Sequence, residues 1–371
     1  MSDWPAPTEY TIAVQNPHVC FRDPELKSAV VQRTVSTGMP KVWTGNFSQV
    51  YELRTATGRW AVKCFTRSVT DIQARYAKIA AAISRSRLPC FVAFECLDRE
   101  MLVNGARWPV LKMRWSAGQP LDQFVEANLA RPRALLSTAS RLFQLVKDLE
   151  RRRLAHGDLQ HGNIMIAESG VELVDYDGMF VPAFAGTGAP EGGLPSYQHP
   201  DRSATDYAVG LDRFSVLVIG TALYALSVDP SLWTEFGARD NLLFTSDDFR
   251  NPAASRLIQR LSALDDPQLR SLIASLTIAC AARPLEVSLP DRPISERPLA
   301  RHRFWWVSPP APDGAARGAQ NPTPTAVGKR RLANPLRTLG AALRARLDPA
   351  TVALARTLNR KFRIRVMLRS R

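Results

Sequence analysis

The stretch that most constrains the fold of this chain is the run of residues 156–178, HGDLQHGNIMIAESGVELVDYDG. Its first part, GDLQHGN, is rich in turn-forming residues and predicts a loop that carries Asp158 and Asn163. The apolar residues IMI follow at once, ESG predicts a tight turn, and VELV predicts a returning strand that ends at Asp175. A hairpin of this kind brings Asp158, Asn163 and Asp175 to one edge of a small cleft.

These three side chains form a set that suits phosphoryl transfer. One carboxylate can orient an attacking hydroxyl, while the amide and the second carboxylate can hold Mg²⁺. Two unrelated surface turns with ordinary capping Asp residues would show the same letters. The choice between these interpretations therefore depends on the rest of the chain.

The loop HGDLQHGN resembles the catalytic loop of the protein-kinase superfamily, with the spacing from Asp158 to Asn163 unchanged. The tripeptide DYD at 175–177 is similar to the metal-binding DFG turn, with Tyr replacing Phe and Asp177 replacing Gly. The resemblance implies that Asp158 is the catalytic base and that Asn163 and Asp175 hold Mg²⁺.

Residues 41–65, KVWTGNFSQVYELRTATGRWAVKCF, predict a meander of three strands with turns at TGN and ATG. The first turn is similar to a kinase Gly-rich loop in degraded form, since Gly45 is the one glycine that remains of three. Trp43 and Ser48 stand at the other two glycine positions, and Phe47 stands at the aromatic position. The backbone amides of this turn can still face a phosphate, though less freely than with three glycines.

The tetrapeptide WAVK resembles the VAIK signature of the third kinase strand. It implies that Lys63 contacts the α- and β-phosphates of ATP and that Val50 and Ala61 lie above the adenine ring. A solvated lysine on an edge strand is the plainer interpretation of Lys63.

Residues 70–86 predict an Ala-rich helix, which in kinases supplies a Glu that pairs with the strand lysine. No acidic residue lies between Asp71 and Glu95, and Asp71 stands too early in the helix to match. This departure from the kinase pattern predicts slow catalysis, because the lysine lacks its usual partner.

The segment KMRWSAGQPLDQFV at 112–125 resembles the kinase hinge and the first helix of the large lobe. It implies that Met113 occupies the gatekeeper position and that the backbone of residues 114–116, Trp115 included, lies against the adenine. Met165 would form the floor beneath the adenine, although a Met in such a place is more often plain core.

YQHPD resembles the end of a kinase activation segment, which implies a buried pair between Asp201 and Arg283. LDRFS resembles the start of the central helix and implies that Asp212 bonds back to the catalytic-loop backbone. HGD with His161 also resembles the aminoglycoside phosphotransferases. Those enzymes lack a pair of the Asp201–Arg283 kind, so a protein kinase is favoured. Gly157 replaces the usual Arg before the catalytic Asp, which predicts that phosphorylation of the activation segment is not the switch.

Together these motifs cover residues 40–290 in kinase order and imply an α+β, bilobal, protein-kinase-like fold. We expect an N-terminal leader segment at 1–39, a small antiparallel β lobe at 40–117 and a larger, mainly helical lobe at 118–290. The apolar run VLVIGTALYALSV at 216–228 is too short to span a bilayer and predicts a buried helix.

The net charge of +15 comes almost entirely from the C-terminal part of the chain. Residues 291–371 contain 18 Lys/Arg and 4 Asp/Glu, whereas residues 1–290 contain 31 and 30. Residues 291–334 predict a Pro/Gly/Ala-rich linker, and residues 335–371 predict a basic amphipathic tail. This tail is either simply solvated or docks an acidic partner or an anionic membrane surface. Specific binding to nucleic acid is not favoured, because the basic residues lack interleaved aromatic residues.

The five cysteines form no CxxC pair and the N-terminus has no secretory pattern, so we expect a reduced, cytoplasmic protein of bacterial type. The favoured function is ATP- and Mg²⁺-dependent phosphoryl transfer to Ser or Thr hydroxyls of a protein, autophosphorylation included. A pseudokinase that serves as a nucleotide-binding scaffold and a small-molecule phosphotransferase are the alternatives. The resemblance also suggests a cognate phosphatase and a von Willebrand-type protein as partners.

Overall fold

The computed structural model describes residues 4–45, 47–67, 71–237, 240–290 and 294. The predicted linker at 291–334, apart from Ile294, and the predicted basic tail at 335–371 lie outside the described residues.

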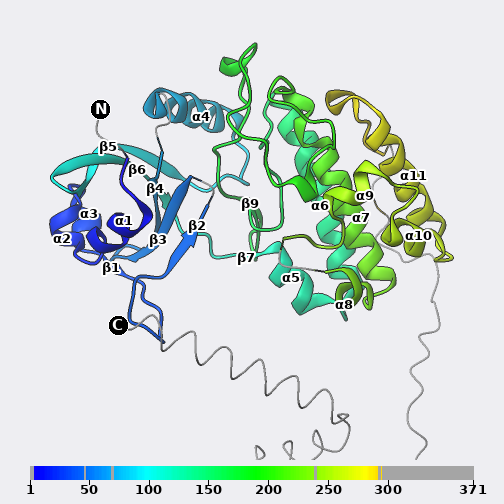
Figure 1. Cartoon of the computed structure of the whole chain (residues 1–371), viewed down its shortest axis with the longest axis horizontal. Coiled ribbons are helices and arrows are strands. Elements are labelled where there is room, and N and C mark those ends of the chain that lie inside the picture. Colours follow the sequence, from blue (N-terminus) through cyan, green and yellow to red (C-terminus); the bar gives the residue numbers. More distant parts are fainter. Residues whose placement is uncertain (1–3, 46, 68–70, 238–239, 291–293, 295–371) are drawn as a thin grey trace, which may run out of the picture. The chain divides into compact units, whose positions relative to one another are not determined.

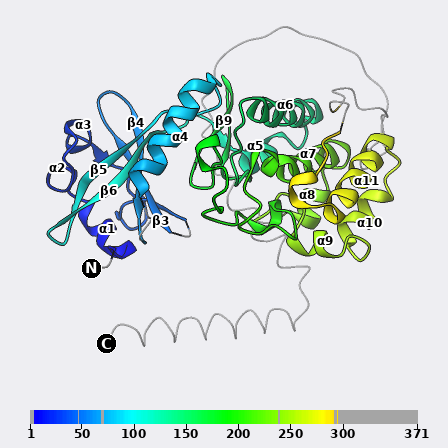
Figure 2. The ribbon, with the colours of Figure 1, turned by 90° about the horizontal axis from the view of Figure 1, so that it is seen from above.

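The small lobe is built on an antiparallel sheet with the strand order β1-β3-β4-β6-β5, in which β2 also pairs with β3 (Figure 1). The strands are β1 Val30–Val31, β2 Val42–Thr44, β3 Ser48–Arg54, β4 Arg59–Phe65, β5 Phe94–Val103 and β6 Ala106–Arg114. The three-strand meander predicted for residues 41–65 is confirmed as β2, β3 and β4. Helix α4, Ile72–Ser86, packs beside β5 (Figure 2) and confirms the predicted Ala-rich helix.

Alternation along the strands divides the side chains of this sheet between two cores. On β4, Val62 and Cys64 belong to a core on one face, whereas Phe65 belongs to the core on the face of α4 and the large lobe. Successive side chains of a strand point to opposite faces, so Lys63 lies on the same face as Phe65. This alternation directs Lys63 toward the large lobe.

The segment before residue 40 is part of the small lobe and not a separate leader segment. It forms the short helices α1 Pro7–Ala13, α2 Pro17–Cys20 and α3 Pro24–Lys27, each with Pro in its first turn. Figures 1 and 2 show these helices on the side of the sheet that faces away from the large lobe. Tyr10, Phe21 and Leu26 are fully buried against the sheet, and the Tyr10 hydroxyl donates a hydrogen bond to the Phe65 carbonyl (2.8 Å).

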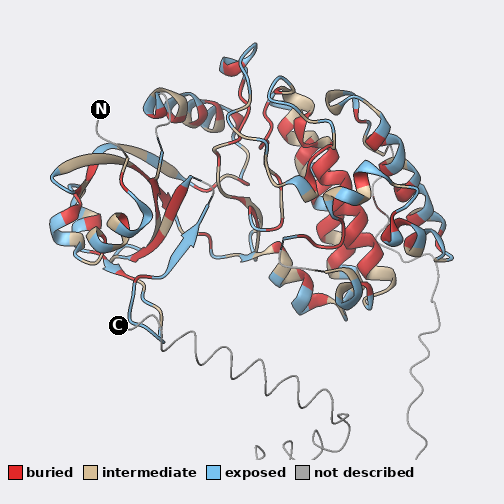
Figure 3. Cartoon of the chain, viewed as in Figure 1, coloured by how far each residue is buried: buried red, intermediate tan, exposed pale blue. Residues whose placement is uncertain are grey.

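The large lobe is mainly helical and is organised around one buried helix, α7. Its elements are β7 Gln119–Pro120, α5 Leu121–Asn128, α6 Pro132–Arg151, β8 Ile164–Ala167, β9 Gly170–Leu173, α7 Arg213–Val228, α8 Leu232–Phe236, α9 Ser246–Arg250, α10 Arg256–Ser262 and α11 Pro267–Ala281. Helices α6 and α11 pack against α7, whose residues are buried along most of its length (Figure 3). The stretch Val209–Val228 is long and apolar enough to cross a membrane by length and composition alone, but it forms the core of this lobe. The buried helix predicted for residues 216–228 is confirmed.

The hairpin predicted around the ESG turn is also present, as β8 and β9 joined in antiparallel register. A small antiparallel β lobe followed by a larger helical lobe is the α+β, bilobal, protein-kinase-like fold expected from the sequence.

Candidate active site

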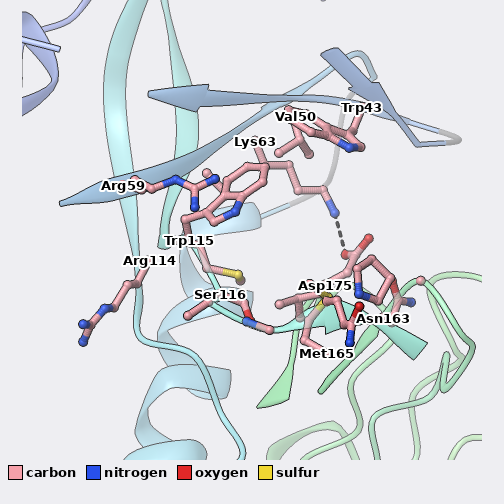
Figure 4. A pocket seen from close by; sticks show the side chains of 18 of the residues that line it. Trp43, Val50, Arg59, Lys63, Arg114, Trp115, Ser116, Asn163, Met165 and Asp175 are labelled. Atoms are coloured by element: carbon pink, nitrogen blue, oxygen red, sulfur yellow. Dashed lines mark hydrogen bonds and ion pairs between the residues drawn. The ribbon is translucent and has the colours of Figure 1, made fainter. Parts of the chain in front are cut away.

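A cavity of about 520 Å³ lies where the small-lobe sheet meets the segment 115–118 and the β8–β9 hairpin. This volume is in the range that holds a small molecule or cofactor. Figure 4 shows side chains of both lobes converging on the cavity. Eight of the predicted site residues line it: Val50, Ala61, Lys63, Met113, Trp115, Asn163, Met165 and Asp175.

Strand register explains why the upper wall of the cavity has this composition. Val50 on β3 lies directly opposite Lys63 on β4, and Ala61 on β4 lies opposite Met113 on β6. Directly opposed residues of antiparallel strands share one face of the sheet, so all four side chains face the cavity. Met165 on β8 reaches the cavity from the large lobe. The wall is therefore apolar except for the lysine.

Two aromatic rings, those of Trp43 and Trp115, line the cavity. The Trp43 and Trp115 rings are 4.9 Å apart between centroids, and the Arg59 guanidinium lies 5.2 Å from the Trp115 ring. The Arg114 side chain points away from the cavity in Figure 4. Indole rings offer a broad apolar surface that suits a planar ligand, and the Arg59 guanidinium adds positive charge beside it.

Three residues predicted to contact the nucleotide do not line this cavity. The Gly45 N–H donates to the Ser48 carbonyl (3.0 Å) and closes the turn, while Ser48 itself is buried on β3. The Phe47 ring lies against the Arg67 guanidinium, 3.1 Å from the ring centroid, and lines a smaller cavity of about 40 Å³ toward α4. Phe47 is thus turned away from the main cavity.

The loop at residues 156–163 places Asp158 and Asn163 in direct contact. The Asn163 side-chain amide donates to the Asp158 carboxylate (3.0 Å) and to the Asp158 backbone carbonyl (2.9 Å). The other Asp158 carboxylate oxygen accepts a hydrogen bond from the Leu194 backbone N–H (2.9 Å). These contacts fix the orientation of both side chains, and they bring the segment around Leu194 onto the predicted base.

Asp212 holds the backbone of this loop, as the sequence predicts. Its buried carboxylate accepts hydrogen bonds from the His156 N–H (2.5 Å) and the Gly157 N–H (2.8 Å). Burial raises the pKa of Asp212, although these bonds and nearby positive charge oppose the shift. At Gly157, φ is +81° and an added Cβ would lie 2.1 Å from the Gly178 carbonyl oxygen, so no larger residue fits.

The predicted pair of Asp201 and Arg283 is wrong. The Arg283 side chain is 84% exposed and lies 3.5 Å from Glu286. The Arg202 N–H donates a hydrogen bond to the His199 carbonyl and closes a turn, and this turn leaves Asp201 exposed. The contacts of this segment come from its neighbours: His199 bonds the Ala279 carbonyl of α11 (2.9 Å), and Arg202 donates to the Gly157 carbonyl (2.8 Å).

Lys63 makes one of the contacts between the two lobes. Its buried ammonium group lies 2.6 Å from a carboxylate oxygen of Asp175 and 2.6 Å from one of Asp177. Burial alone would lower the pKa of Lys63, but the two negative charges outweigh it and raise the pKa. Asp175 adopts a left-handed backbone conformation with φ of +65°, which is uncommon outside glycine and clusters at functional sites.

Helix α4 contributes two residues to the site that the sequence analysis did not identify. The Tyr76 hydroxyl donates a hydrogen bond to Asp177, and Arg75 donates to the backbone carbonyls of Asp177 (2.6 Å) and Met179 (3.2 Å). The sequence does contain a sign that Asp177 could pair with Lys63. An acid stands at the third position of DYD, and α4 contains no acid that could pair with the lysine instead.

Glu191 is a further carboxylate near the site that the sequence analysis missed. Burial, together with the negative charges of Asp175, Asp177 and Asp158, raises the pKa of Glu191 to about 7, although Lys63 opposes the shift. Perturbed carboxylates of this kind gather at functional sites. Its position in a Gly/Pro-rich stretch gave no local signal.

The predicted Mg²⁺ ligands suit a hard cation, which prefers oxygen ligands. Asp175 lines the cavity with a side chain that is 43% exposed, and Asn163 lines it as well. Within the described part of the chain, no group of three or more His, Cys, Asp or Glu side chains has the arrangement of a metal site. Mg²⁺ commonly binds through one or two protein groups, with substrate phosphates and water completing the shell, and these two residues fit that pattern.

No protein-family model matches this chain, and no curated protein matches it. Among solved structures, the chain is similar to the kinase PK-1 of Cydia pomonella granulovirus, with a TM-score of 0.46 and 16% sequence identity. That similarity covers 69% of this chain and 90% of the viral kinase chain.

Proposed function

We propose that this protein transfers the γ-phosphoryl group of ATP to a Ser or Thr hydroxyl of a protein. The observation that carries the proposal is the contact of Lys63 with Asp175 at 2.6 Å across the wall of a cavity that Asn163 also lines. Lys63 and Asp175 lie 112 residues apart in the sequence. Phosphoryl transfer needs a cation for the phosphates, oxygen ligands for Mg²⁺ and a carboxylate for the hydroxyl, and this site supplies all three.

The cavity has separate parts for the base and for the phosphates. Val50, Ala61, Met113 and Met165 provide apolar walls for a planar base. Lys63 is the cation that would contact the phosphates, because its ammonium group points to the side of the cavity where Asp175 and Asn163 lie (Figure 4). Asn163 and Asp175 would hold Mg²⁺, which supplies neutralisation of the phosphate charge when bound.

Asp158 is the group that would orient the hydroxyl and accept its proton. Each oxygen of its carboxylate already accepts one hydrogen bond, from Asn163 or from Leu194. A carboxylate oxygen can accept about two, so both oxygens retain capacity for a substrate hydroxyl. The fixed orientation of this group supports catalysis by positioning.

A nucleotide-binding scaffold is the second candidate. It is favoured by the turn at Gly45, which holds Phe47 and Ser48 away from the main cavity and so leaves the phosphates with fewer backbone donors. Such a protein would bind nucleotide without transferring phosphate.

Two measurements on the full chain distinguish these functions. Binding of ATP with Mg²⁺ is followed as a shift in melting temperature, and transfer is followed by mass spectrometry after incubation with ATP. Asp158→Asn is expected to retain the shift and to lower transfer by about 10²–10⁴-fold, the usual contribution of a general base. Binding without transfer in the unmodified protein favours the scaffold, and unchanged transfer in Asp158→Asn would refute the role of Asp158. ATP consumption that depends on an added metabolite would indicate a small-molecule phosphotransferase.

A further inference from the structure

Helix α4, which lies beside Lys63, has no acidic side chain that could pair with the lysine. The sequence of α4, IQARYAKIAAAISRS, contains no Asp or Glu. Lys63 is nevertheless 6% exposed, and a buried ammonium group needs a compensating charge. Two carboxylates supply it, those of Asp175 and Asp177, each at 2.6 Å.

The two carboxylates differ in what else they touch. Asp175 contacts Lys63 through one oxygen, lines the main cavity and has a side chain that is 43% exposed. Asp177 contacts Lys63 through one oxygen and accepts the Tyr76 hydroxyl on the other, and its side chain is 28% exposed. Asp177 lines the small cavity toward α4 and not the main one. Asp175 is therefore the carboxylate that faces a ligand, and Asp177 is the one fixed within the protein.

Helix α4 secures the turn at Asp177 through two consecutive side chains, those of Arg75 and Tyr76. Burial and the nearby negative charge of Asp177 raise the pKa of Tyr76, so its hydroxyl stays protonated and donates. Arg75 bonds the Asp177 and Met179 carbonyls, contacts the Tyr207 hydroxyl (3.1 Å) and lies 4.5 Å from the Phe184 ring. The connection from the helix to the lysine thus runs from Tyr76 through Asp177 to Lys63.

We infer that Asp177 is the positioning residue for Lys63 and that Tyr76 couples α4 to it. This inference rests on the proposed function, since it assigns Lys63 to the phosphates of ATP. When a ligand engages Asp175, Asp177 keeps Lys63 in place. The missing helix acid is replaced by an acid two residues beyond Asp175, held by a tyrosine of the helix.

The test uses the full chain and five variants, one of which, Asp177→Gly, is the reference for the double variant described below. Asp177→Asn removes the charge with little change in shape, and Tyr76→Phe removes only the hydroxyl. Asp177→Gly combined with Tyr76→Glu moves the acid from the turn to the helix. Asp23→Asn is the matched control, because Asp23 pairs with another buried lysine of the same sheet, Lys112, at 3.0 Å.

Kinetics give the first measure. Asp177→Asn is expected to lower kcat/KM for ATP by about 10²-fold, the effect of a displaced reacting group, with an unchanged Mg²⁺ requirement. Tyr76→Phe is expected to lower it by about 10-fold, as for the loss of one charge-assisted hydrogen bond. The double variant Asp177→Gly/Tyr76→Glu should recover at least about 10-fold over Asp177→Gly alone, which a purely structural role of Asp177 does not predict.

Chemical labelling of Lys63 gives a second measure that needs no activity. An amine-specific reagent, read by peptide mass spectrometry, should modify Lys63 faster in Asp177→Asn and in Tyr76→Phe than in the unmodified protein or in Asp23→Asn. Unchanged labelling and unchanged kcat/KM in Asp177→Asn would overturn the inference. A raised Mg²⁺ requirement with unchanged labelling would also overturn it and make Asp177 a metal ligand. Failure of the unmodified protein to bind ATP would instead refute the proposed function, and the labelling result would still decide the role of Asp177.

Discussion

Two lysines of the small-lobe sheet are alike in burial and pairing but differ in their surroundings. Lys63 on β4 and Lys112 on β6 are each 6% exposed, and each contacts two carboxylates. Lys112 lies opposite Val62 in the strand register, one position from Lys63, so the two side chains point to opposite faces of the sheet. One faces the large lobe, and the other faces the N-terminal helices.

The partners of Lys112 belong to its own lobe and are held by further bonds. Asp23 also caps α3 by accepting the Leu26 N–H (2.9 Å), and Glu25 also accepts the Trp60 indole N–H (2.7 Å). The partners of Lys63 come from the other lobe, and one of them faces a cavity. All partners of Lys112 are thus fixed within its own lobe, which suits a role in stability. The proposed function gives Lys63 a role in chemistry, because one of its partners faces a cavity.

The sharpest way to break this comparison is to remove each ammonium group in turn. Lys63→Met is expected to lower phosphoryl transfer by at least about 10²-fold, because the phosphates lose the cation that positions them. Steady-state kinetics with ATP as the varied substrate measures the loss. Transfer at the unmodified rate would show that Lys63 is only a structural lysine.

Lys112→Met should lower stability and leave phosphoryl transfer unchanged. It leaves Asp23 and Glu25 without their cation, and since these side chains are 16% and 26% exposed, water compensates only in part. We expect a loss of about 2–3 kcal/mol in the free energy of unfolding, somewhat below the usual effect of breaking a fully buried pair. Urea unfolding measures the loss, and kcat and KM serve as controls that should not change. A kinetic defect at full stability would contradict this division of roles.

The surplus of negative charge around Lys63 gives a third test, at Glu191. Its raised pKa of about 7 means that the folded protein favours the protonated carboxyl, so its contribution to stability is complete below the ordinary pKa of 4.5 and is lost as pH rises through 7. Glu191→Gln should remove this dependence and raise Tm at pH 8 by roughly 2–4 °C, the effect of about 1 kcal/mol in a domain of this size. At pH 4 the two proteins should melt together. A Tm gain that is equal at both pH values would show that charge is not the cause.

The smallest expected effect is at Glu25, on the Lys112 side. Burial alone would raise the pKa of Glu25, but hydrogen bonds from Lys112, Thr57, Trp60 and Thr55 lower it to about 2. The stability that Glu25 contributes is therefore present above pH 4.5 and is lost as pH falls toward 2. Glu25→Gln should flatten this part of the acid-denaturation curve, by less than about 1 kcal/mol, because the group is partly exposed. If the acid-denaturation transition of Glu25→Gln is the same as that of the unmodified protein, Glu25 does not contribute to stability through its pair with Lys112.

The parts of the site that the sequence predicted are those defined by short local motifs. Asp158, Asn163 and Asp175 flank one hairpin, and Lys63 comes from a strand whose alternation fixes its direction. Strong local patterns of turns and alternating strands specify such positions with few alternatives. The Asp212 contact was predictable for the same reason, because its helix begins with a recognisable pentapeptide.

The parts that escaped prediction depend on contacts between distant segments. Tyr76 and Asp177 are 101 residues apart, and nothing in the helix pattern marks Tyr76 as more than a core residue. The prediction that Asp201 pairs with Arg283 is wrong because a turn at His199–Arg202 leaves Asp201 exposed. His199 and Arg202 make the contacts of this segment instead. The helices of residues 7–27 are four to seven residues long, too short for a periodic pattern to show which face is buried.

These short N-terminal helices have a practical consequence for anyone who prepares a trimmed version of the protein. A fragment that starts at residue 40 would lose Tyr10, Phe21 and Leu26 and leave Tyr51 and Val62 uncovered on the outer sheet face. An uncovered apolar face of this kind promotes self-association, and such a fragment would be expected to precipitate even with every catalytic group intact. The shortest soluble piece therefore has to begin ahead of Pro7.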